Sequence, residues 1–69
     1  MLDDNTDLMN MSIDQLHKEY EMRLRQLESW IEYKSEITGD EALKVVQREI
    51  NWFQDRVKRI RQVLEYRQQ

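Results

Sequence analysis

The sequence predicts an all-α fold, an antiparallel two-helix hairpin that resembles a coiled coil. Three observations support this prediction. The chain of 69 residues contains no proline and a single glycine, which is too few turn residues for a compact β architecture. The apolar residues of its second half recur at alternating spacings of three and four, the heptad pattern of a helix packed along another helix. The one glycine, Gly39, lies between two long helical stretches.

The first eleven residues differ from the rest of the chain. Residues 1–11 are polar and acidic and show no helical periodicity, so we expect a flexible acidic N-terminal arm. We also consider that this arm docks through Leu2, Leu8 or Met9. The remainder, residues 12–69, is expected to form one helical hairpin domain.

The first long helix is expected over about residues 13–37. Ser12 and Gln15 have the spacing of a capping box, in which the serine hydroxyl and the glutamine side chain each bond the other residue's backbone N–H. The inward positions of this helix form a less regular seam than those of the second helix. They place His17 near its start and Lys34 near its end.

The connection between the helices is expected at residues 38–41. Gly39 is predicted to end the first helix with a positive φ, and Thr38 or Asp40 to cap the second. A connection of this length makes the two helices antiparallel neighbours.

The second long helix is expected over about residues 41–67, with an unbroken apolar seam. In an antiparallel pair centred on the turn, this seam matches that of the first helix. Phe53 then faces Leu24, and Ile50 faces Leu27. Every a and d position from Leu43 to Leu64 is apolar, namely Leu43, Val46, Ile50, Phe53, Val57, Ile60 and Leu64.

A second apolar face borders the seam on both helices. It carries both tryptophans and two of the tyrosines, with arginines in its middle. A face of this composition indicates an interface, so we expect a homodimer, a four-helix bundle of two hairpins, or binding of another protein. The predicted dimer or partner interface comprises Leu16, Arg23, Trp30, Tyr33, Ile37, Val45, Trp52, Arg56, Arg59, Val63 and Tyr66.

The residues that carry chemistry are sparse. The chain has no cysteine and one histidine, His17, for which no nucleophile partner is evident. We therefore expect no enzyme activity, no catalytic, cofactor-binding or metal-binding residues, no cofactor and no small-molecule substrate. No signal peptide or long apolar run is present, so a cytoplasmic location without a membrane partner is expected.

The function that best fits this pattern is that of a small interaction protein, an adaptor, inhibitor or regulator that binds another macromolecule. The alternative is an RNA- or DNA-binding regulator that uses Arg23, Arg56, Arg59 and neighbouring aromatic rings. A net charge of −3 weighs against this alternative. The candidate nucleic-acid contacts are Arg56, Lys58, Arg59 and Arg61.

Overall fold

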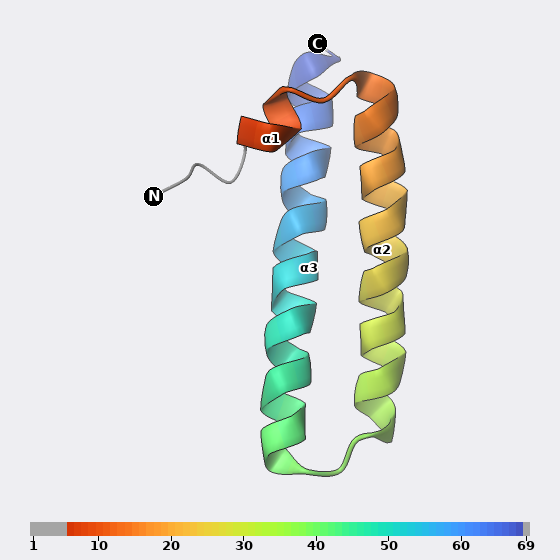
Figure 1. The fold of residues 1–69 in the computed structure, drawn as a ribbon, viewed down its shortest axis with the longest axis vertical. Coiled ribbons are helices and arrows are strands. Elements are labelled where there is room, and N and C mark those ends of the chain that lie inside the picture. Colours follow the sequence, from red (N-terminus) through yellow and green to blue (C-terminus); the bar gives the residue numbers. More distant parts are fainter. Residues whose placement is uncertain (1–5, 69) are drawn as a thin grey trace.

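The protein is a helical hairpin with a short helix packed at its open end. The computed structural model describes residues 6–68, which form α1 (Thr6–Met9), α2 (Ile13–Glu36) and α3 (Asp40–Arg67). Helices α2 and α3 run antiparallel and side by side (Figure 1). We call the end with the α2–α3 connection the closed end and the opposite end, where α1 lies against α3, the open end. The predicted all-α hairpin is confirmed.

The start of α2 has the predicted capping box. The backbone N–H of Gln15 donates to Ser12 Oγ at 3.1 Å, and the backbone N–H of Ser12 donates to Gln15 Oε1 at 2.8 Å. Two N–H groups that the first turn leaves without partners are thereby satisfied. The preceding residue, Met11, packs against the adjacent apolar cluster and fixes the direction from which the chain enters α2.

The closed-end connection differs from the prediction. Gly39 has φ −85° and is the N-cap of α3, so the predicted positive φ is wrong. Ile37 ends α2 in an extended conformation, and its backbone N–H donates to the carbonyl oxygen of Lys34 at 3.2 Å. The chain reverses through extended residues rather than a left-handed cap. Since Gly39 is the cap, neither Thr38 nor Asp40 has the predicted capping role.

The predicted seam of α3 is confirmed at most positions. Leu43 and Val57 are half-buried. Phe53 and Leu24 belong to one cluster with Ile50 and Leu27, as the antiparallel pairing requires. The buried seam residues are Val46, Ile50, Phe53, Ile60 and Leu64.

The seam of α2 is rotated relative to the prediction. His17 is exposed and Leu16 is fully buried, so the core position predicted for His17 is wrong. Farther along, Ile31 is 48% exposed while Trp30 is half-buried. A straight helix drifts by about 20° per heptad relative to a 3.5-residue repeat, and burying leucine rather than imidazole favours the same rotation. At the closed end Lys34 is exposed and donates to Gln47 Oε1.

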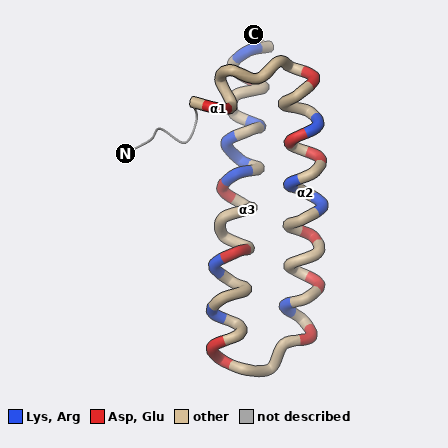
Figure 2. Tube along the Cα trace, viewed as in Figure 1, with Lys and Arg blue, Asp and Glu red and all other residues tan. Residues whose placement is uncertain are grey.

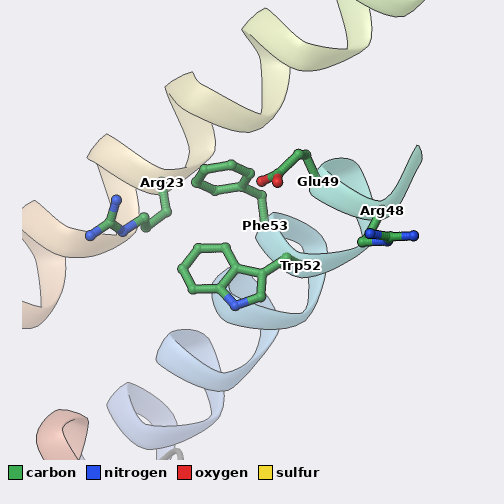
Figure 3. Close-up of a pocket in the computed structure, with 5 residues that line it drawn as sticks. All are labelled: Arg23, Arg48, Glu49, Trp52 and Phe53. Atoms are coloured by element: carbon green, nitrogen blue, oxygen red, sulfur yellow. The ribbon is translucent and has the colours of Figure 1, made fainter. Parts of the chain in front are cut away.

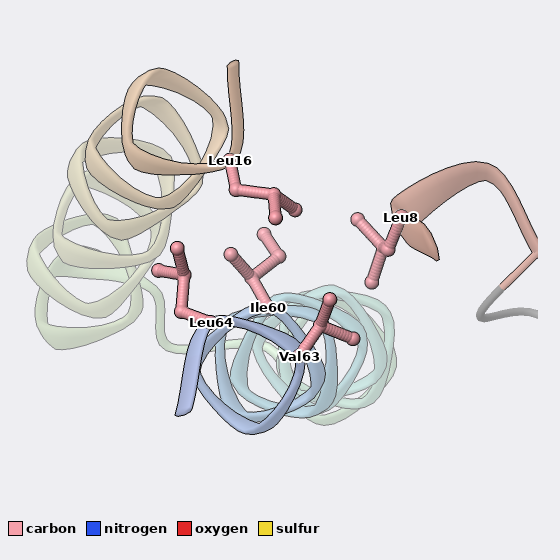
Figure 4. Close-up of a cluster of buried hydrophobic side chains, with 5 residues drawn as sticks. All are labelled: Leu8, Leu16, Ile60, Val63 and Leu64. Carbon is pink, nitrogen blue, oxygen red and sulfur yellow. The ribbon is translucent and has the colours of Figure 1, made fainter. Parts of the chain in front are cut away.

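The apolar core is divided into two clusters along the hairpin. The closed-end cluster comprises Leu27, Val46, Ile50 and Phe53, with Leu24, Trp30 and Ile37 packed against it. The open-end cluster comprises Leu8, Leu16, Ile60, Val63 and Leu64, with Met11, Ile13 and Tyr20 packed against it. Figure 4 shows side chains from α1, α2 and α3 pointing toward one another in the open-end cluster.

Helix α1 lies within the predicted N-terminal arm. Leu8 is fully buried, whereas Met9 is 47% exposed, so Leu8 is the docked residue of these two. Leu2, the third residue considered, lies outside the described residues, and the flexibility expected for residues 1–11 stays a prediction. In the part of the chain that the structure describes, no helix has the length and apolar character needed to span a bilayer.

Candidate interaction face

Helical spacing places the predicted interface residues of α2 and α3 along one side of the hairpin, which we call the aromatic face. Its two helices are linked across the surface by Glu19 of α2 and Arg56 of α3, whose side chains approach to 3.7 Å. Toward the closed end they are linked again by a shared hollow that Arg23 and Trp52 line. Helix α1 covers the open-end half of this face and leaves the closed-end half uncovered.

The open-end half of the aromatic face is covered by α1. Leu8 is 0% exposed and packs with Leu16 and Val63, which are 0% and 5% exposed. Ile60 of the α3 seam belongs to the same cluster and is also 0% exposed. Leu16 and Val63 were predicted to contact a partner, but in this structure their partner is Leu8 of the same chain.

A network of charged side chains lies between the two halves. Arg23 Nε donates to Glu19 Oε1 at 2.7 Å, and its Nη1 donates to Gln26 Oε1 at 2.7 Å. Arg56 Nη2 donates to Asp7 Oδ2 at 2.7 Å and approaches Glu19 Oε1 at 3.7 Å. Arg56 therefore joins all three helices, and Asp7 is the acidic residue through which α1 contacts the centre of the face.

This network shifts the ionisation of both members of the α1 contact. The hydrogen bond from Arg56 lowers the pKa of Asp7 below the ordinary aspartate value, although partial burial opposes the shift. The same hydrogen bond raises the pKa of Arg56. The network does not satisfy the guanidinium completely, because Arg56 Nε is buried without a hydrogen-bond partner among the described residues.

The closed-end half of the aromatic face is uncovered. Tyr33, Val45 and Trp52 are 52%, 55% and 52% exposed, and Trp30 and Ile37 beside them are half-buried. The Trp30 and Tyr33 rings meet edge to face, with centroids 5.9 Å apart. Large side chains exposed together in this way are typical of an interaction surface.

A hollow of about 410 Å³ lies beside Trp52. Phe53 forms its apolar wall, and the Trp52 ring stands edge to face against Phe53, with centroids 4.9 Å apart. Arg23, Arg48 and Glu49 line the remainder, so cations flank the rings (Figure 3). The chemistry of the hollow suits an apolar side chain with a neighbouring carboxylate.

The candidate nucleic-acid residues are spread around α3. Basic residues gather in its C-terminal half (Figure 2), but Arg56 contacts Asp7, and Arg59 Nε donates to Asp55 Oδ2 at 2.6 Å. Lys58 and Arg61 are exposed, and helical spacing places them away from Arg56 and Arg59. Nearby carboxylates thus neutralise the arginines of the aromatic face, which reduces its attraction for phosphate.

The remaining predicted interface residue, Tyr66, lies near the end of α3 and is 69% exposed. Reasoning from the sequence missed Asp7 and Glu19, the acidic members of the central network, and did not identify α1 as the cover of Leu16. The available signal was the pair Asp7 and Leu8, an acidic and an apolar residue adjacent in a segment that also contains Leu2, Met9 and Met11.

The described residues contain no group of three or more histidine, cysteine, aspartate or glutamate side chains arranged to hold a metal ion. Comparison of the chain with protein-family models, with curated proteins and with solved structures finds no match.

Proposed function

We propose that this protein is a non-enzymatic interaction protein that acts through the aromatic face, and that a second copy of the chain binds there. The observation that carries the proposal is the closed-end half, where Tyr33, Val45 and Trp52 are each about half exposed. Covering these side chains removes apolar area from water, which is the main driving force for association.

The size of the face supports a second copy as its occupant. Helix α3 has 28 residues, which gives a length of about 42 Å at about 1.5 Å per residue. Two adjacent helices, each about 10 Å wide, then form a face of about 800 Å², which includes the half that α1 covers. A standard protein–protein interface buries about 800 Å² on each partner, so the whole face has the size that a stable dimer needs.

The architecture supports the same occupant. A two-helix seam leaves its core layers covered on one side only, and two hairpins packed face to face complete a four-helix bundle. Twofold symmetry brings the same surface of each copy together, so a face rich in aromatic and apolar side chains binds its own copy. The bundle would then serve as an adaptor, inhibitor or regulator of another macromolecule. Its cytoplasmic location stays a prediction.

The proposal is tested by size-exclusion chromatography with light scattering on the full chain. We expect a dimer for the wild type and a monomer for Trp52→Glu, because the introduced carboxylate would be buried at the interface. Gln54→Glu is the matched control. Gln54 is exposed and lies two residues after Trp52, on the opposite side of α3, so the variant should remain dimeric. A wild-type monomer at tens of micromolar, or identical assembly of both variants, contradicts the proposal.

The nucleic-acid alternative gives a different result. Binding through phosphate contacts releases counterions, so nucleic acid would co-purify at low salt and dissociate at moderate salt. The Arg56→Gln variant would then lose that binding. We expect instead an absorbance spectrum free of nucleic acid for both proteins, because the arginines of the face already contact carboxylates.

A further inference from the structure

We infer that α1 is a displaceable cover, which occupies the open-end half of the aromatic face and competes with a second copy of the chain for it. This inference rests on the proposed function, since it assumes that a second copy binds the face. The surface in dispute consists of Leu16 and Val63, both buried in one cluster with Leu8.

The position of α1 makes the competition unavoidable. Leu8 lies over Leu16 of α2 and Val63 of α3, at the centre of the open-end half (Figure 4). Two hairpins packed face to face over their whole length are related by a twofold axis that runs either along or across the helices. In both arrangements the open-end half lies inside the interface, so a docked α1 would stand between the two copies.

The available area shows what a second copy would gain if α1 moved away. The uncovered half spans α3 from Asp40 to about Phe53, which is about 20 Å of helix and about 400 Å² of face. That is half of the area of about 800 Å² that each partner buries in a standard interface. The open-end half supplies the missing area. The covered state therefore favours the monomer or a loose dimer, and the uncovered state favours the complete bundle.

Among the residues that the structure describes, the contacts that hold α1 are few. It has four residues, and a helix this short has no stability of its own. Leu8 is its one buried residue among those described. The Asp7 side chain is 55% exposed, so water and salt weaken its ion pair with Arg56. Arg67 Nη1 also donates to the carbonyl oxygen of Met11, next to α2. Release of α1 thus breaks a small set of contacts and leaves the α2–α3 seam intact.

Helix α1 also shows which chemistry the face accepts. It places a leucine against apolar side chains and an aspartate against Arg56. The closed-end hollow repeats this combination without a cover, with Trp52 and Phe53 beside Arg23 and Arg48. A second copy brings apolar and acidic side chains of the same kinds.

The test measures the dimer dissociation constant of the full-length protein by sedimentation equilibrium. In Leu8→Ser the leucine no longer anchors α1. A larger fraction of the molecules then has an uncovered open-end half that can bind a second copy. If α1 is docked in at least nine-tenths of wild-type molecules, the constant falls by about 100-fold or more, because each of the two copies must be uncovered and each contributes about tenfold. Met9→Ser is the matched control in the same helix, since Met9 is 47% exposed, and should leave the constant unchanged.

A second variant keeps the test valid if Leu8→Ser lowers the helicity seen by far-ultraviolet circular dichroism. Asp7→Lys places a like charge beside Arg56 without changing the apolar core, and it should tighten the dimer in the same direction. An unchanged or weaker dimer in both variants, with helicity intact, overturns the inference.

The outcomes separate this inference from the proposed function. A wild-type dimer that Trp52→Glu abolishes but Leu8→Ser and Asp7→Lys do not tighten supports the interface and overturns the cover. A wild-type monomer that dimerises as Leu8→Ser supports the cover and contradicts the dimer proposed for the wild type, because the closed-end half alone then does not bind a copy. Monomers in every case overturn both.

Discussion

The two halves of the aromatic face have related sequence patterns but different exposure. Leu16 and Trp30 occupy the same heptad row of α2, yet Leu16 is 0% exposed and Trp30 is only half-buried. The difference is that Leu8 covers the open-end half and no described residue covers the closed-end half in the same way. The comparison shows that a heptad pattern identifies which residues share a face. A few residues elsewhere in the chain decide how much of that face water can reach.

The largest expected effect distinguishes the buried half from the exposed one. Leu16→Ala removes a 0%-exposed side chain that packs in one cluster with Leu8, and it should lower the free energy of unfolding by about 2–5 kcal/mol. Trp52→Ala, at a 52%-exposed site, should change it by less than about 1 kcal/mol at concentrations where the chain is monomeric. Urea denaturation monitored by circular dichroism measures both. Equal losses would mean that the two halves are equally buried and would remove the basis of the comparison.

A smaller effect concerns pH. Because the folded pKa of Asp7 is lowered, its ion pair favours α1 docking fully at pH values above the unfolded pKa of about 3.9. That contribution is lost as the pH falls through the folded pKa. The Leu8 methyl signals in an NMR titration should therefore shift toward those of a released α1 in acid.

Asp7→Asn is the control for this titration, since the amide does not ionise. The Glu19 carboxylate also approaches Arg56, at 3.7 Å, so a Glu19→Gln variant identifies its share of the change. If Asp7→Asn shows the same acid-dependent shift as the wild type, the Asp7 pair has no part in holding α1.

The smallest effect is expected at the closed end, away from the aromatic face. Gly39→Ser provides a side-chain oxygen that can cap α3, because the N-cap position of α3 lacks a side-chain hydrogen bond. A Cβ at Gly39 would meet Ala42 Cβ at 3.9 Å, an ordinary contact, and φ of −85° suits any residue. We expect a gain of a few tenths of a kcal/mol in thermal unfolding, with assembly unchanged. A loss of stability would mean that the connection requires glycine.

The sequence was sufficient to predict the hairpin because its signals are long and repeated. The α3 seam from Leu43 to Leu64 has no polar residue at a core position, and Ser12 with Gln15 marks the start of α2. The aromatic face also followed from heptad spacing, which places Trp30 and Trp52 beside the seam.

The features that could not be predicted depend on packing between segments far apart in the chain. Four residues are too few to show helical periodicity, so α1 gave no pattern. Leu16 rather than His17 lies in the core because α2 is rotated and because Leu8 packs in the same cluster as Leu16. A heptad assignment of α2 alone predicts neither the rotation nor the contact with Leu8. The conformation of Gly39 was mistaken because glycine permits a positive φ but does not require it.

The most direct test of the central claim is an NMR dilution series on the full-length protein and on Leu8→Ser. We expect concentration-dependent shifts at the Trp30 and Trp52 indole N–H groups in the wild type. In Leu8→Ser the shifts should extend to the Leu16 and Val63 methyl groups, because the open-end half then joins the interface. Shifts confined to residues outside the aromatic face, or none at all in either protein, would contradict the account.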